Sequence, residues 1–134
     1  MRVVVDAGVV FSGAGWGGEA YLCLAALARR RVLAFATTHT LEELRRAVEA
    51  IGFKAVHSPY TILEWYYGAA KMVAPAPLGK QRSRDATDDP YLACALAASA
   101  QFIVSRDHDL LVLGKPFGIG IITPREMLTR LTVG

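Results

Sequence analysis

At 134 residues, of which 53% are hydrophobic, the chain is long enough for one domain with a filled core and too short for two ordinary ones. The N-terminal apolar run ends at Asp6 after three residues, which excludes a signal peptide or a membrane-spanning start. We therefore expect a single domain over residues 1–134 in a cytoplasmic protein, with no membrane association. Cys23 and Cys94 lie in apolar helical sequence, which predicts buried, reduced thiols.

Short β-branched runs alternate with longer apolar helical segments along the chain. The run Val3–Val5 is continuous, which is typical of a strand buried on both faces. The glycine-rich segment 12–18 predicts a flexible loop, and the Pro-, Gly- and Arg-rich segment 74–85 predicts another. We expect strands at 3–5, 31–37, 101–105 and 118–123, helices at 19–30, 40–51, 59–72 and 89–100, a short helix within 106–114 and a last helix from 123.

Four capping patterns predict where helices begin. Thr40–Glu43 and Thr123–Glu126 have the spacing of capping boxes. Ser58–Pro59 has the form of an N-cap followed by a first helical proline. Asp89 precedes a proline in the same way and is a candidate N-cap of the apolar helix.

The order of these elements predicts an α/β fold, a three-layer α/β/α sandwich with a central, mostly parallel sheet and right-handed crossovers. Ligands of such sheets bind outside the carboxyl ends of the strands. Asp6 closes the first strand, Asp107 follows the strand at 101–105, and Asp89 opens the helix leading into that strand. We therefore expect these carboxylates to share one edge of the sheet.

Clustered carboxylates without histidine or cysteine suit Mg²⁺ or Mn²⁺, which prefer oxygen ligands. Such an ion supplies a nucleophilic water and neutralises charge during phosphodiester hydrolysis. It also explains how the acids tolerate one another, since without a cation each would raise the pKa values of the others. Asp6 is the strongest candidate, because a charge directly after a buried strand is unfavourable without a partner or a function.

The other candidates also have structural interpretations. Asp89 could simply cap its helix, and Glu43 could complete a capping box. Asp107 and Asp109 follow a strand, where solvated turn aspartates are common. Both interpretations stay open, because one carboxylate oxygen can cap a helix while the other binds a metal.

The basic residues suggest a polyanionic partner. Seven of the twelve acidic residues fall in the expected cluster, which leaves five against fifteen Lys and Arg elsewhere. The remaining surface is therefore strongly basic and suits a nucleic acid. Arg84 and Arg106 either hold phosphate or balance neighbouring carboxylates.

Four segments in this order resemble a PIN domain, of the group described as toxins of bacterial toxin-antitoxin pairs: VVVDAGVVFSG, TLEELRRAV, RDATDDPYLACALAASAQFIVSRDHDLL and GIGIITPREML. The resemblance runs from residue 2 to about residue 131. It implies a compact α/β/α fold and a Mg²⁺- or Mn²⁺-dependent ribonuclease acting on RNA. It also implies a cognate antitoxin protein that covers the acidic site or a neighbouring groove.

The resemblance assigns roles to individual residues. It makes Asp6, Glu43, Asp89 and Asp107 the catalytic acids. The implied metal ligands are Asp6, Asp89 and Asp107, with Asp88 as an adjacent alternative to Asp89 and Asp109 at a more variable acidic position. Ser12 matches a small polar residue near the metal, and with Arg84 and Arg106 it completes the predicted RNA-binding set.

One departure from the family concerns the first motif. The family has Asp-Thr-Asn or Asp-Ser-Asn where this chain has Asp6-Ala7-Gly8, so the usual supporting hydroxyl and amide are absent and activity is expected to be reduced. An alternative is a degenerate PIN domain that binds RNA or protein without cutting. A phosphatase or phosphotransfer domain with Asp6 as nucleophile is disfavoured, because Gly8 replaces the second acid and Lys115 lies in a loop.

The aromatic segment 63–73 leaves two interpretations open. It contains Trp65, Tyr66 and Tyr67 together with several apolar residues, more than a small monomer readily buries. We expect a homodimer on this basis, and an ordinary core face is the alternative.

Overall fold

The computed structural model describes residues 1–51 and 59–133, so the predicted N-cap at Ser58 lies outside the described residues. The strands are β1 (Arg2–Val5), β2 (Leu33–Ala36), β3 (Lys71–Met72), β4 (Phe102–Val104) and β5 (Gly120–Ile122). The α-helices are α1 (Ala7–Gly15), α2 (Gly18–Ala28), α3 (Thr38–Ile51), α4 (Pro59–Ala69), α5 (Asp89–Ala97), α6 (His108–Leu111) and α7 (Pro124–Val133).

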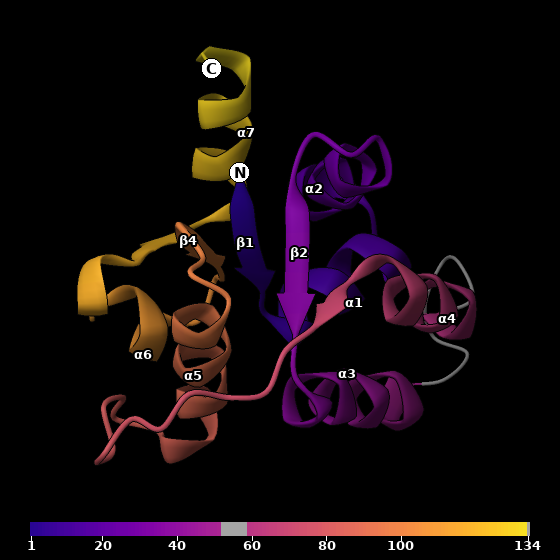
Figure 1. The fold of residues 1–134 in the computed structure, drawn as a ribbon. Helices are drawn as coiled ribbons and strands as arrows, with labels where there is room; N and C mark the ends of the chain where they lie inside the picture. Colours follow the sequence, from indigo (N-terminus) through magenta and orange to yellow (C-terminus); the bar gives the residue numbers. More distant parts are fainter. Residues whose placement is uncertain (52–58, 134) are drawn as a thin grey trace.

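A five-stranded, entirely parallel sheet of order β3-β2-β1-β4-β5 forms the centre of the molecule (Figure 1). Val3, Val4 and Val5 of the central strand are buried, and Val5 pairs with Val104 of β4. Helices flank the sheet: α5 packs on β1, β2 and β4, while α1 and α7 both pack against α2. The predicted α/β fold with a parallel sheet is confirmed. Because β1 and β4 are parallel neighbours, the residues that follow them meet at one edge.

The sequence predicted that the glycine-rich segment 12–18 is a loop. The structure differs, because α1 continues to Gly15. A Cβ on Gly13 would lie 2.8 Å from the carbonyl carbon and oxygen of Ala20. The glycine therefore permits the close approach of α1 and α2. Within this segment, Gly17 and Gly18, with φ values of 82° and 72°, use the left-handed region to turn the chain.

This packing predicts opposite effects for two helical glycines. Gly13→Ala should lower the free energy of unfolding by about 1–3 kcal/mol, because the added methyl group forces α1 and α2 apart. Gly68→Ala in α4 should raise it by about 0.5–1 kcal/mol, because a Cβ there meets nothing within 4 Å. Urea unfolding of both variants checks the pair, and similar changes in both would contradict the packing argument.

The helix caps differ from the predicted ones in a way that affects the acidic residues. At the start of α3, Thr37 N–H donates to Thr40 Oγ1 (2.9 Å) and Thr40 N–H to Thr37 Oγ1 (3.2 Å). Thr40 and Glu43 therefore do not form the expected capping box, and Glu43 is left without a capping role. The box at Thr123–Glu126 is confirmed by reciprocal bonds of 3.1 and 3.2 Å.

Asp89 is likewise not a helix cap. A 3₁₀ turn, η2 (Ala86–Asp88), runs directly into α5, and Asp85 caps this turn by accepting from the backbone N–H of Thr87 at 3.0 Å. Because the turn precedes α5, Asp88 and Asp89 leave the chain in different directions.

Three smaller predictions can be compared with the structure. The helix expected over 59–72 stops at Ala69, and Lys71–Met72 forms the edge strand β3, because its backbone pairs with β2. Cys23 and Cys94 are both buried and free, as predicted. Within residues 1–51 and 59–133, no helix combines the length and apolar character that crossing a membrane requires.

Candidate active site

Ser105 links the two aspartates that follow β1 and β4. Its hydroxyl donates to Asp6 Oδ2 (2.6 Å) and accepts from the backbone N–H of Asp107 (2.9 Å). The Ser105 side chain is fully buried, and both bonds are partly buried. The structure thus brings Asp6 and Asp107 together, as the sequence predicted. Ser105 was not among the predicted site residues.

The remaining bonds of these two aspartates fix their orientation. Asp6 Oδ1 accepts from the backbone N–H of Gly8 (3.0 Å) and caps α1. Asp107 Oδ1 accepts from the backbone N–H of Asp109 (2.9 Å) and caps the short helix α6. A carboxylate oxygen can accept more than one bond, so both groups remain able to bind a cation.

Glu43 approaches the same group from α3. Burial raises the pKa of Glu43, a hydrogen bond from Tyr91 opposes that rise, and the charges of Asp6 and Asp107 add to it. These neighbours place the Glu43 carboxylate within electrostatic reach of both aspartates. Three of the four predicted catalytic acids therefore converge at the carboxyl ends of β1 and β4.

Tyr91 of α5 is a second residue that the sequence did not single out. It is fully buried, and its hydroxyl accepts from the backbone N–H of Ala7 (3.1 Å). Burial raises the pKa of Tyr91 above its usual value, and the charges of Asp6 and Glu43 raise it further, so the hydroxyl stays protonated. Tyr91 therefore places a hydroxyl beside Ala7, where this chain lacks the hydroxyl and the amide of the family's first motif.

Asp88 and Asp89 have different surroundings in the structure. Asp88 is only 5% exposed, and its Oδ2 is buried with no hydrogen-bond partner among the described residues. Burial and then the neighbouring Asp107 raise the pKa of Asp88 to about 7. The sequence favoured Asp89 and kept Asp88 as the alternative. The structure places Asp88 beside Asp107.

Both carboxylate oxygens of Asp89 are directed to a different part of the molecule. Oδ1 accepts from the backbone N–H of Ser83 (2.7 Å), and Oδ2 accepts from that of Arg82 (3.0 Å). These bonds hold Asp89 against the loop that precedes η2. Both oxygens of Asp89 therefore have partners outside the group of Asp6 and Asp107, and its role as a metal ligand stays a prediction.

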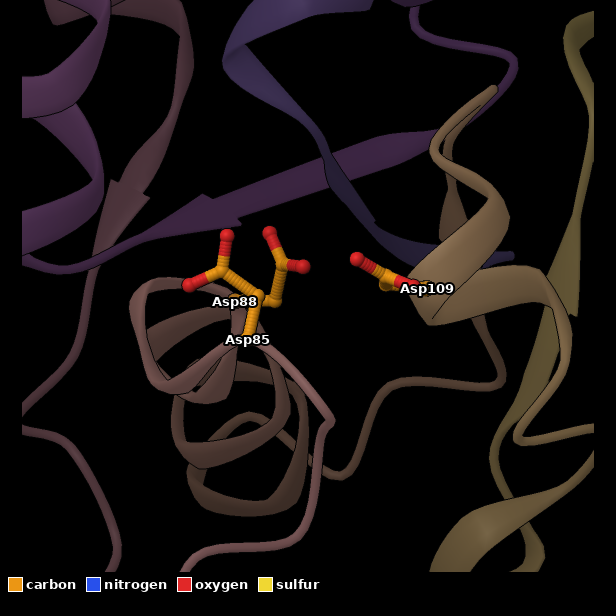
Figure 2. A group of neighbouring side chains, drawn as sticks. All are labelled: Asp85, Asp88 and Asp109. Atoms are coloured by element: carbon orange, nitrogen blue, oxygen red, sulfur yellow. The ribbon is translucent and has the colours of Figure 1, made fainter.

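Asp88 also belongs to a second acidic group, with Asp85 and Asp109. One carboxylate oxygen from each of these residues lies within 4.8 Å of the other two. Figure 2 shows Asp85 and Asp88 on the turn before α5, and Asp109 pointing toward them from α6. Arg84 Nη2 lies 2.9 Å from Asp109 Oδ1, so Arg84 balances a carboxylate here, one of its two predicted roles.

The other predicted RNA-binding residues lie at the mouth of the site. Ser12 and Arg106 line a pocket of about 410 Å³ together with Asp6 and Asp107. Arg106 Nη1 donates to Ser12 Oγ at 3.3 Å. A cation and a hydroxyl thus lie beside two of the acids, which suits a phosphate group that approaches them.

The donor set fits a hard divalent cation. Every candidate ligand is a carboxylate, the ligand type that Mg²⁺ and Mn²⁺ prefer. The partnerless, buried oxygen of Asp88 is the clearest sign, because burying a carboxylate without a compensating partner is unfavourable. Asp88 is the residue shared by the two acidic groups.

The comparisons with known proteins agree with this fold. The family model described as the PIN domain matches residues 2–109, and the chain therefore belongs to the PIN domain family, whose members are generally metal-dependent nucleases. The crystal structure of PAE2754 from Pyrobaculum aerophilum is similar in fold, with a TM-score of 0.68 and 19% identity. The match covers 100% of this chain and 91% of that one. No curated protein matches the sequence.

Proposed function

We propose that the protein is a metal-dependent ribonuclease that hydrolyses RNA phosphodiester bonds. The observation that carries this proposal is the buried, partnerless oxygen of Asp88 beside Asp107. In a family of nucleases, such an oxygen is best explained as a ligand to a divalent ion. Asp6, Asp88 and Asp107 would hold Mg²⁺ or Mn²⁺, with Glu43 close by and Asp109 at the outer edge.

The chain's own residues position the reactants. Ser105 fixes Asp6 relative to Asp107, and Tyr91 bonds the start of α1 and opposes the rise that burial causes in the pKa of Glu43. When bound, the metal ion activates a water molecule and neutralises charge on the phosphate. Arg106, at the pocket beside Ser12, orients the phosphate for in-line attack. Attack by water leaves a 5′-phosphate and a 3′-hydroxyl.

The finer biological role is a proposal from the sequence alone. Similarity to the toxin group supports a toxin with a cognate antitoxin that covers the acidic site. The proposed homodimer rests on the aromatic segment 63–73, where Tyr67 is 41% and Met72 51% exposed while Tyr66 is buried. Exposed apolar side chains of this kind suit a protein interface.

The second candidate is a degenerate PIN domain that binds RNA without cutting it. The observation that favours it is Asp6-Ala7-Gly8, which lacks the supporting hydroxyl and amide. Tyr91 and Ser105 weigh against it, because their hydroxyls bond the acids or the adjacent backbone. Catalytic support is therefore present, although from other positions in the chain.

Incubation of a labelled single-stranded RNA with the protein separates the two candidates. With Mn²⁺ or Mg²⁺ we expect fragments that carry a 5′-phosphate and a 3′-hydroxyl, and with EDTA we expect intact RNA. End-group analysis by phosphatase treatment and gel electrophoresis reads the products. RNA that is bound and left intact in Mn²⁺ would support the degenerate candidate and contradict the ribonuclease.

A further inference from the structure

We propose that Asp89 is a positioning residue for substrate binding: it holds residues 80–84, the basic loop, in a shape that binds backbone phosphates of the RNA strand. The inference rests on the proposed function and assigns a substrate contact to the same site. The basic loop carries three exposed cations, Lys80, Arg82 and Arg84.

The bonds of Asp89 order the backbone of this loop. The two carboxylate oxygens accept from two successive backbone N–H groups, those of Arg82 (3.0 Å) and Ser83 (2.7 Å). Hydrogen bonds to an ionised acceptor are stronger than neutral ones. Since Asp89 is the first residue of α5, the loop is fixed to the start of a helix that packs on the sheet.

Side-chain contacts hold the loop from two further directions. Arg82 Nη2 donates to the carbonyl oxygen of Leu78 (3.0 Å), and its guanidinium lies 5.2 Å from the centre of the Phe117 ring. Gln81 Nε2 donates to the carbonyl oxygen of Ser83 (2.8 Å). The cations of the loop therefore project from an ordered backbone, which lowers the entropy lost when a ligand binds.

The basic loop lies beside the acids. Arg84 reaches Asp109 at 2.9 Å, and Asp89 adjoins Asp88 in the chain. A polyanion that approaches a group of carboxylates is repelled unless cations nearby attract its phosphates. The loop supplies such cations at the edge of the site, where phosphates next to the scissile one would lie.

A pair of neighbouring substitutions tests this assignment. In Asp89→Asn only one oxygen remains, and the new NH₂ group faces a backbone N–H donor, so the loop loses a hydrogen bond. We expect the Kd for single-stranded RNA, measured by fluorescence anisotropy without divalent metal, to rise about tenfold. Mn²⁺ affinity, measured by electron paramagnetic resonance, should stay unchanged. The matched variant Asp88→Asn should lose Mn²⁺ affinity by more than about tenfold and keep its RNA affinity.

A second pair tests the cations of the loop directly and keeps the two bonds from Asp89 to its backbone. Lys80→Ala combined with Arg82→Ala should lower the slope of log K against log salt by about 1.4, because each phosphate contact to a single strand contributes about 0.7. Arg29→Ala combined with Arg31→Ala removes the same charge between α2 and β2, at the opposite edge of the sheet, and should leave the slope unchanged.

The outcomes distinguish this inference from the proposed function. Suppose that the wild-type protein binds RNA, and that Asp89→Asn and the Lys80→Ala, Arg82→Ala double variant bind it as tightly as the wild type does. The role of Asp89 is then overturned, while the proposed ribonuclease activity is not. Loss of Mn²⁺ affinity in Asp89→Asn, as in Asp88→Asn, also overturns it. If the wild-type protein binds no RNA, both proposals are overturned together.

Discussion

Replacing Asp88 with asparagine should lower metal-dependent RNA cleavage at least about a hundredfold, because it removes a negative ligand from the ion. The partnerless oxygen of Asp88 beside Asp107 is the physical reason. Single-turnover cleavage at saturating RNA measures the effect, together with Mn²⁺ titration. Asp89→Asn is the matched control, and at saturating RNA it should keep most of the wild-type rate. Equal loss in both variants would contradict the assignment of Asp88.

The stability of the same variant shows whether lost cleavage reflects lost folding. Burial, and then Asp107, raise the pKa of Asp88 to about 7. The pKa of an aspartate in the unfolded chain is about 4. The stability this residue contributes in the metal-free protein is therefore fully present below about pH 4 and is lost as the pH rises toward about 7. The uncharged amide in Asp88→Asn avoids that loss, so in EDTA the variant should melt at a higher temperature than the wild type at pH 8. If Asp88→Asn instead melts at a lower temperature than the wild type at pH 8, the loss of cleavage reflects a less stable fold.

The strands and the general position of the site could be predicted because their signals are local. Continuous apolar runs marked β1, β2, β4 and β5, and a charge after a buried strand marked Asp6. The full extent of helix α1 was not predicted, since glycines usually indicate a loop and only the packing of Gly13 against α2 explains a glycine inside this helix. The strand β3 has a helix-forming sequence, and only pairing with β2 makes it a strand.

The choice between Asp88 and Asp89 shows where sequence reasoning about the site reaches its limit. The two residues are adjacent and chemically identical, and the 3₁₀ turn η2 decides which of them faces the acids. Ser105 and Tyr91 were missed for a different reason. A serine at the end of a strand and a tyrosine in an apolar helix are common core residues, and only their hydrogen bonds reveal their part in the site.

Replacing Ser105 should have large effects on both the stability of the fold and the affinity for Mn²⁺. Ser105→Ala removes the donor to Asp6 Oδ2 and the acceptor of the partly buried Asp107 N–H. We expect the free energy of unfolding to fall by about 1–3 kcal/mol. Because both aspartates lose an orienting bond, Mn²⁺ affinity should fall by about 10- to 100-fold. Urea unfolding and Mn²⁺ titration measure the two effects separately.

The chain offers a matched control for Ser105 in another buried serine. Ser83 is 3% exposed, and its hydroxyl has no hydrogen-bond partner among the described residues. Ser83→Ala should therefore leave stability unchanged or raise it, and should not alter Mn²⁺ affinity. Ser105→Thr keeps the hydroxyl and should restore part of the lost Mn²⁺ affinity, although its extra methyl group must fit a filled space. If Ser105→Ala weakens folding and still binds Mn²⁺ like the wild type, the hydroxyl stabilises the fold without orienting the metal ligands.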